Sequence, residues 1–128
     1  MLLPCQVALA QVLSKLDATA LAEKFVVENG YTSASPERVK RQPDFESVER
    51  TDNRSEMLQQ RFNTLLSKAI GAKQGRKGSA VGWSIAFEYT LTVANMHDIC
   101  RVVTMNDDGS NMHMEHVDGF RKFFAGFD

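Results

Sequence analysis

The stretch AVGWSIAFEYTLTV, residues 80–93, decides the fold that this sequence predicts, because its side chains change character at every second position. Large apolar residues, from Val81 to Val93, alternate with residues that are small or polar. A period of two over so many residues is typical of an antiparallel β-strand with one buried face. The strand is longer than most, so we expect it to bend or bulge at Gly82 or Ala86.

Two further strands are expected after this one, which gives an antiparallel meander at residues 80–94, 99–106 and 111–117. ICRVVTM provides the second strand and NMHMEHV the third, with NDDGS between them. The Asp108-Gly109 pair in NDDGS is a strong hairpin signal. We therefore expect a two-residue turn there.

The first helix is expected near residues 6–29, where apolar side chains recur with helical spacing. Asp17 is a candidate cap that would divide this helix in two, and Gly30 is suited to close it. Residues 31–51 follow, with two prolines and mixed charge, which indicates an irregular connector. Its RVKR run is compatible with a short edge strand that ends at Pro43.

A second helix is expected near residues 53–70. Asn53 and Glu56 have the spacing of a capping box, and apolar residues from Leu58 to Ala69 form one stripe. The segment GAKQGRKGS, residues 71–79, is then predicted to be a flexible basic loop.

The fold class that follows is α+β, in a single domain over residues 1–128. We expect the N-terminal helices to pack on a curved antiparallel meander, in a cone-like arrangement. The predicted core joins Trp83, Phe87, Leu91, Leu58, Phe62 and Leu65. A short C-terminal helix should pack four rings against the body, since Phe120, Phe123, Phe124 and Phe127 recur with helical spacing.

Composition sets limits on the class of protein. Hydrophobic residues make up 43% and charged residues 24% of 128 residues, with a net charge of −1, so neither a nucleic acid nor an anionic membrane is expected as partner. Cys5 and Cys100 lie far apart, which favours reduced thiols. With no signal peptide and no membrane-spanning run, we expect a cytoplasmic protein.

The run NMHMEH, residues 111–116, holds two histidines and a glutamate. On a strand, His113 and Glu115 share one face beside Thr104, while His116 points to the other. We therefore predict no zinc site that joins the two histidines, and no metal or other cofactor. A polar binding face and an ordinary solvated face both stay open for His113 and Glu115.

The basic segment at residues 68–77 is not a phosphate-binding loop. The pattern G-x-x-x-x-G-K-[ST] requires glycine where Arg76 stands, and that motif follows a strand rather than preceding one. Its basic side chains, Arg76 and Lys77 among them, are compatible with a solvated loop, with a contact to an acidic partner or with a contact to nucleic acid. Cys100 is expected to be a buried strand cysteine rather than a nucleophile.

Three longer phrases carry a family resemblance. FVVENGYTSASP, RFNTLLSKAIGAKQGRKGSAVGWSIAFEYT and CRVVTMNDDGSNMHMEHVDGF, in this order, resemble a family of small bacterial immunity proteins from polymorphic toxin systems. The resemblance spans roughly residues 21–124. It implies a cone fold like that of nuclear transport factor 2, no enzymatic activity, and a cognate toxin domain as the binding partner.

Charge suggests where such a toxin would bind. After His97, acidic residues outnumber the basic residues Arg101, Arg121 and Lys122, whereas the segment at 68–77 is basic, so we expect the charges to be separated in space. A toxin that acts on nucleic acids or nucleotides has a positive cleft, which an acidic hairpin tip would cover. The predicted partner contacts are Asp107, Asp108, His113 and Glu115, with Arg76 and Lys77 as the second region.

Two other function classes stay open. A ligand-binding protein or small enzyme would use the pocket of the cone, but Tyr89 is the one titratable residue among the expected inward positions of the first strand. A nucleic-acid module is favoured by the basic segment and disfavoured by the net charge of −1.

Overall fold

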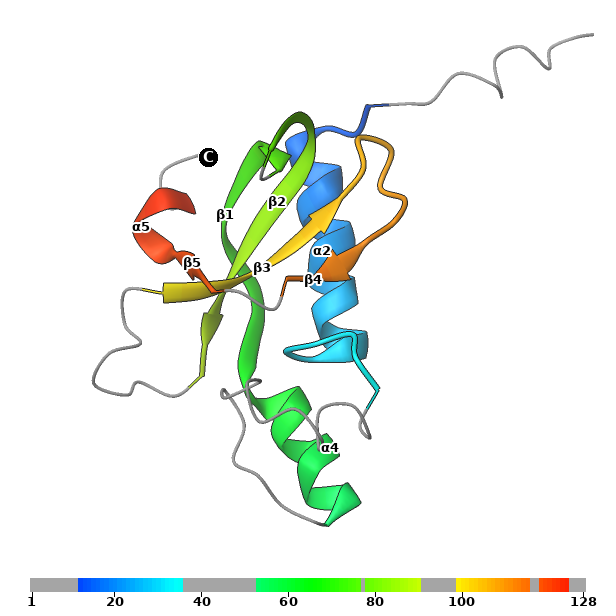
Figure 1. The fold of residues 1–128 in the computed structure, drawn as a ribbon, viewed down its shortest axis with the longest axis vertical. Coiled ribbons are helices and arrows are strands. Elements are labelled where there is room, and N and C mark those ends of the chain that lie inside the picture. Colours follow the sequence, from blue (N-terminus) through cyan, green and yellow to red (C-terminus); the bar gives the residue numbers. More distant parts are fainter. Residues whose placement is uncertain (1–11, 36–52, 77, 91–98, 116–117, 125–128) are drawn as a thin grey trace, which may run out of the picture.

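Helices and one antiparallel sheet make up the fold, so the predicted α+β class is confirmed (Figure 1). The computed structural model describes residues 12–35, 53–76, 78–90, 99–115 and 118–124. The elements are α2 (Lys15–Asn29), α4 (Arg54–Asn63), β1 (Leu65–Arg76), β2 (Ser79–Tyr89), β3 (Ile99–Met105), β4 (His113–Met114), β5 (Gly119–Phe120) and α5 (Arg121–Phe124).

The sheet has the strand order β1-β2-β3-β4. The short strand β5 also pairs with β3, at Ile99 and Cys100, whereas β4 pairs with β3 at Val103 and Thr104. All pairings are antiparallel. Pairing of β1 with β2 is interrupted where β2 passes through Gly82, whose φ is +92°, and again opposite Ala86. The strand pairing is therefore irregular at both positions that were predicted to bend. Near Gly82 the extra residues belong to β2, whereas opposite Ala86 the extra residue belongs to β1.

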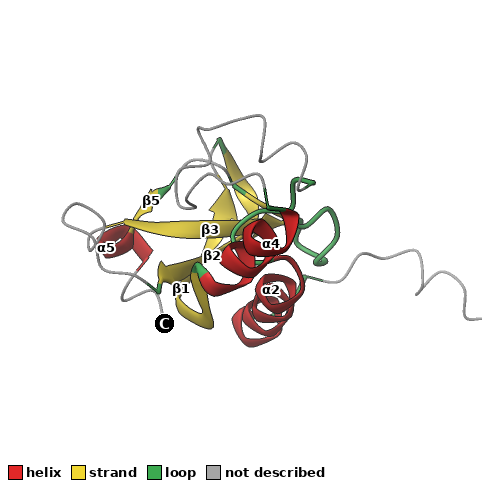
Figure 2. Cartoon of the chain, turned by 90° about the horizontal axis from the view of Figure 1, so that it is seen from below, coloured by secondary structure: helices red, strands yellow, loops and turns green. Residues whose placement is uncertain are grey.

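The helices lie on different sides of the sheet. In both views α2 lies on one side of the strands and α5 on the other (Figure 1 and Figure 2). We call the face toward α2 the inner face and the opposite face the outer face. Alternation along β2 places Trp83, Ile85 and Phe87 on the inner face and Ser84 and Ala86 on the outer face.

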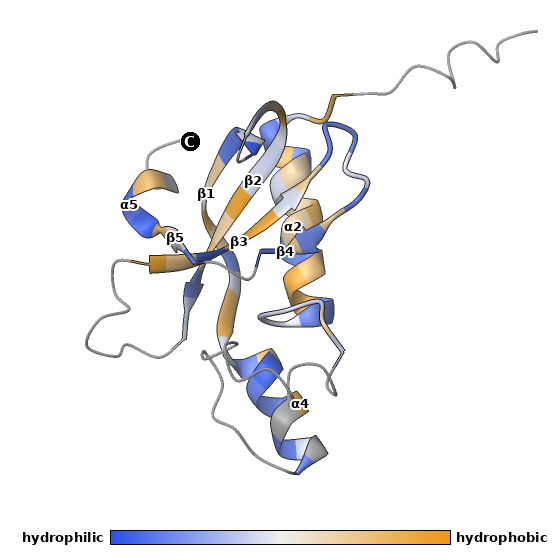
Figure 3. Ribbon diagram, in the orientation of Figure 1, coloured by the Kyte–Doolittle hydropathy of each residue, from blue (hydrophilic) through white to orange (hydrophobic). Residues whose placement is uncertain are grey.

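The core fills the space between α2 and the inner face. Large side chains of β2 and β3, such as Phe87 and Val103, pack with the small residues Ala18 and Ala22 of α2. The alanines let α2 approach the sheet closely, while the larger Leu16 of the same helix is exposed. The middle of β2 and β3 is accordingly hydrophobic, and the loop between β3 and β4 is hydrophilic (Figure 3).

The first helix begins later than predicted. Ser14 is its N-cap, and the Ser14 side chain accepts a hydrogen bond from the N–H of Asp17. The prediction that Asp17 caps a second segment is therefore wrong. Gly30 ends the helix with φ +75°, as predicted, and its N–H donates to the Val26 carbonyl. The candidate strand around RVKR, residues 38–41, lies outside the described residues.

The second helix ends much earlier than predicted. Asn53 caps it by accepting the N–H of Glu56, as expected, but the helix stops at Asn63 and the segment predicted as helix end and basic loop is the strand β1. The reason is tertiary. The free edge of β2 needs a hydrogen-bonding partner, and backbone pairing along Leu65–Arg76 outweighs the helical spacing of the apolar residues.

The predicted core is correct only in part. Trp83, Phe87 and Leu65 are buried in one cluster. Phe62 lies in the last turn of α4 and is exposed, and Leu58 of the same helix is half-buried. Leu91 lies outside the described residues.

The hairpin has the predicted register, with Val103 opposite Met114 and Thr104 opposite His113. Its loop is wider than two residues, since the Asn106 N–H donates to the Ser110 carbonyl. The third strand covers only His113–Met114 within the described residues, rather than 111–117.

The C-terminal aromatic residues do not pack as predicted. Phe120 belongs to β5 and is 72% exposed, and Phe123 of α5 is 47% exposed. The helix α5 has only four residues, too few to turn all the rings toward the body. The side chain of Phe124 and all of Phe127 lie outside the described part.

Truncation of Phe87 tests the assignment of the core. Phe87 is fully buried between β2 and α2, so Phe87→Ala should lower the free energy of unfolding by about 3–5 kcal/mol in urea denaturation. The control is Val81→Ala, because Val81 is 53% exposed on the same strand and should cost about 0.5 kcal/mol or less. Equal losses for the two variants would contradict the core.

Candidate functional site

The outer face of the sheet is divided into two halves. One half is covered by α5 and contains the buried residues Ala86, Cys100 and Val102. The Lys73 ammonium lies 3.3 Å from the centre of the Phe123 ring, and Arg121 forms a 2.7 Å ion pair with Glu88. These two contacts tie α5 to the outer face.

Cys100 lies in the covered half and is buried, as predicted. Burial raises the pKa of its thiol to about 12, and the nearby Asp118 carboxylate adds to the rise. The thiol therefore stays protonated at neutral pH, which makes it a poor nucleophile.

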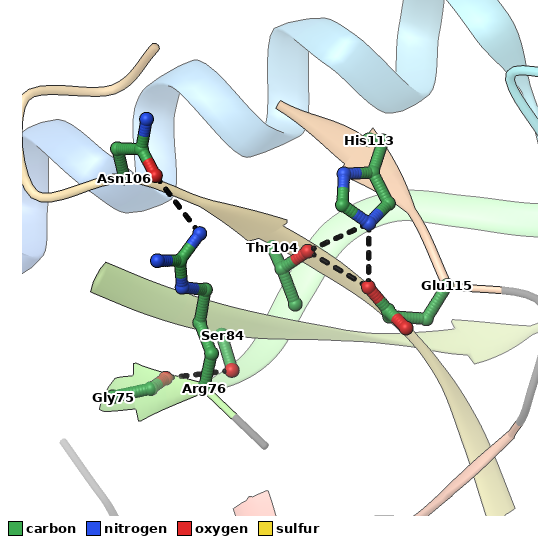
Figure 4. Close-up of polar contacts among 7 residues, drawn as sticks. All are labelled: Gly75, Arg76, Ser84, Thr104, Asn106, His113 and Glu115. Carbon is green, nitrogen blue, oxygen red and sulfur yellow. Dashed lines mark hydrogen bonds and ion pairs between the residues drawn. The ribbon is translucent and has the colours of Figure 1, made fainter. Parts of the chain in front are cut away.

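A row of polar residues, one from each of four neighbouring strands, crosses the outer face from the edge of the half that α5 covers. The register pairs Lys73 with Ser84, Ser84 with Thr104, and Thr104 with His113. We call these four residues the polar row. Figure 4 shows its central members on the side of the sheet away from α2, with the side chains of Arg76 and Glu115 beside them.

His113, Glu115 and Thr104 form a compact group at one end of the row. His113 Nε2 lies 2.7 Å from Glu115 Oε2 and 3.3 Å from Thr104 Oγ1, and the Thr104 hydroxyl donates to Glu115 at 2.9 Å (Figure 4). The carboxylate and the hydroxyl both meet the same ring nitrogen. A catalytic relay needs them on opposite nitrogens, so this geometry suits binding rather than nucleophilic catalysis.

Arg76 crosses the outer face near the other end of the row. Its Nη1 donates to Asn106 Oδ1 at 2.9 Å, which links the end of β1 to the hairpin loop (Figure 4). The path lies over Gly82, because a Cβ added at Gly82 would come 2.6 Å from Arg76 Nε and 2.6 Å from the Met105 carbonyl oxygen. Glycine at this position is what lets the arginine side chain pass.

The two aspartates of the hairpin loop differ in role. Asp107 anchors the loop, because its Oδ1 accepts the Gly82 N–H at 2.6 Å and its carbonyl accepts the Leu13 N–H at 2.8 Å. Asp108 is exposed, and the hydroxyl and N–H of Ser110 both donate to its Oδ1. These hydrogen bonds lower the pKa of Asp108 below its usual value. Asp108 therefore presents a permanent negative charge at neutral pH.

The structure places most of the predicted contact residues on or next to the β3–β4 hairpin. His113 and Glu115 share a face beside Thr104, as predicted, and are 48% and 41% exposed. The expected separation between a basic loop and an acidic hairpin is wrong at Arg76, which belongs to β1 and bonds to the hairpin itself. Lys77, His97 and His116 lie outside the described residues.

Arg101 is a structural residue, although the sequence alone groups it with the basic residues Arg121 and Lys122. It is 1% exposed on the inner face, opposite Phe87. Its Nε lies 2.7 Å from Asp118 Oδ1 and 3.1 Å from the Tyr89 hydroxyl, and its Nη1 donates to the Tyr31 carbonyl at 3.2 Å. The sequence does contain one indication of this burial. Arg101, Val103 and Met105 stand at every second position, so on a strand they share one face.

The charge of Arg101 is balanced by its neighbours. Burial alone would lower the pKa of the guanidinium, but the interactions with Tyr89 and Asp118 outweigh burial and raise the pKa above its ordinary value. The rings of Tyr31 and Tyr89 also lie 5.6 and 5.8 Å from the guanidinium carbon. Arg101 therefore stays charged inside the fold.

Comparisons of the chain with protein-family models, with curated proteins and with solved structures found no match. Within the described residues, no group of three or more His, Cys, Asp or Glu side chains is placed to hold a metal ion. Among the helices that the structure describes, none is long and apolar enough to cross a membrane.

Substitution of Gly82 tests the path of Arg76. Gly82→Ala should be more destabilising than Gly78→Ala by about 1–3 kcal/mol, the usual cost of forcing atoms into filled space. Both glycines have positive φ, but a Cβ at Gly78 meets no atom within 4 Å. The pair therefore separates steric overlap from backbone strain. Equal urea midpoints for the two variants would show that neither Arg76 nor the Met105 carbonyl packs against Gly82.

Proposed function

We propose that this chain is an immunity protein that binds a cognate toxin domain in the cytoplasm and neutralises it. In this proposal the α+β fold is the cone of the nuclear-transport-factor-2-like type, with α2 on the concave face. The resemblance of three sequence phrases to immunity proteins of polymorphic toxin systems supports it. The distribution of packed and exposed groups on the two faces of the sheet supports it independently.

The observation that carries the proposal is that core side chains pack the inner face, while the outer face ends in the exposed pair His113 and Glu115. An enzyme or ligand-binder of this fold would place its chemistry on the inner face. There, Trp83, Ile85 and Phe87 pack in the core with α2. Tyr89, the one titratable residue expected there, uses its hydroxyl in contacts with Arg101 and Asp118. A partner is therefore expected to use side chains outside this core, such as the exposed His113 and Glu115.

The proposed contact surface is the exposed end of the hairpin together with the His113–Glu115 pair. Asp108 projects from the loop with its charge fixed, and Asp107 holds the loop in place through Gly82 and Leu13. A loop anchored in this way loses little conformational entropy on binding. Negative charge at its tip fits a toxin with a positive cleft, and such pairing mainly speeds association.

A toxicity-rescue assay tests this function. The toxin domain encoded beside the gene for this chain would be expressed in cells with or without the chain, and binding of the purified pair would be measured as an association rate. The wild-type chain should restore growth. Asp108→Lys should slow association several-fold at low salt and less at high salt, without a change in the thermal midpoint.

Asp108 is the better site for charge reversal than Asp107, because loss of the Asp107 carboxylate would also release the loop from Gly82. The matched control is Glu28→Lys, which reverses an exposed charge at the far end of α2. It should leave association and rescue unchanged. A wild-type chain that neither binds the toxin domain nor restores growth would refute the function, and equal rates for Asp108→Lys and the control would move the interface away from the hairpin.

A further inference from the structure

We infer that Arg76 is a preformed binding residue for a carboxylate, and that the toxin presents an Asp or Glu side chain to it across the outer face. This inference rests on the proposed function, because it takes the toxin domain as the partner. It extends the contact surface from the hairpin tip onto the sheet.

The first support is the position of the side chain. Arg76 is the last residue of β1. Two residues from elsewhere in the chain hold its guanidinium over the outer face. Gly82 of β2 provides the space for it, and Asn106 after β3 accepts one of its N–H groups. Holding a long side chain before binding removes much of the entropy cost that an exposed arginine pays when it binds a ligand.

The second support is the hydrogen-bonding capacity that Arg76 keeps. A guanidinium has five N–H donors in a fixed fork, and among the described residues only Asn106 accepts from this one. The side chain is half-buried, so water reaches it less freely than a surface arginine. A planar carboxylate matches the remaining edge of the fork and can accept two parallel hydrogen bonds.

Two acidic groups on or next to the β3–β4 hairpin favour a protein carboxylate over nucleic acid. Glu115 stands beside the polar row, and Asp108 projects from the loop that holds Asn106. A polyphosphate chain laid along this end of the sheet would be repelled by the negative charges of Glu115 and Asp108. A protein surface can place one acid against Arg76 and bases against Glu115 and Asp108, so it satisfies all three charges at once.

The experiment measures the dissociation constant of the full chain and its cognate toxin domain by calorimetry. Arg76→Glu should weaken binding about 30-fold or more, the range for a close interfacial charge pair. Arg76→Lys keeps the charge but loses the fork, so it should weaken binding by a smaller factor. The control Lys24→Glu reverses an exposed charge on α2, on the other side of the sheet, and should bind like the wild type.

Charge exchange identifies the partner group. Each surface Asp and Glu of the toxin domain would be replaced by Arg, and one of these toxins should recover binding to Arg76→Glu while it loses binding to the wild-type chain. A merely structural role of Arg76 cannot produce this exchange. Thermal midpoints of every variant confirm that the fold is retained, and Arg76→Lys provides the test if Arg76→Glu does not fold.

Several results would overturn the inference. If the wild type binds the toxin and Arg76→Glu binds equally well, only this inference fails and the proposed function stands. Loss of binding that no toxin charge reversal restores would assign Arg76 a structural role. Tight binding of a single-stranded oligonucleotide that Arg76→Glu abolishes would make nucleic acid the occupant. A wild-type chain without affinity for the toxin removes the proposed function, and this inference with it.

Discussion

A buried positive charge is the constraint on which the arrangement of the chain depends. Arg101 is the largest of the fully buried side chains in the described residues, and it sits between the core and three separate segments. It contacts Tyr31 after α2, Tyr89 at the end of β2 and Asp118 just before β5. A charge removed from water must keep these partners, because an unpaired one costs several kcal/mol. Since β5 leads directly into α5, the same pair fixes where α5 covers the outer face and leaves His113 and Glu115 exposed.

Much of the fold follows from local pattern, and the part that does not follow is tertiary in origin. The alternation in β2, the register of the β3–β4 hairpin and the caps at Asn53 and Gly30 are short-range features that a sequence displays directly. Residues 65–76 carry apolar side chains with helical spacing, yet they form β1. What decides their structure is the edge of β2, whose paired residues lie up to 24 positions further along the chain and whose backbone groups need partners. No local pattern contains that information.

The candidate site was predictable to the extent that it depends on strand parity. His113 and Glu115 share a face beside Thr104 because a strand alternates. The roles of the other residues depend on contacts between strands. Asp107 looks like a second exposed acid in the sequence, but it anchors the loop to Gly82, and Arg76 looks like part of a basic loop, but it crosses the sheet to the hairpin. Glycine at position 82 enables both contacts, and its φ of +92° is visible only in the folded chain.

A double-mutant cycle on Arg101 and Asp118 tests most directly whether this buried pair holds the fold together. Free energies of unfolding would be measured in urea for Arg101→Met, Asp118→Asn and the double variant. Each single variant leaves one charged group without its partner, and Arg101→Met or Asp118→Asn should cost about 3–5 kcal/mol. The double variant should lose clearly less than the two single losses combined, with a coupling of at least about 1 kcal/mol. Additive losses would contradict the account, because they would show that Arg101 and Asp118 act independently.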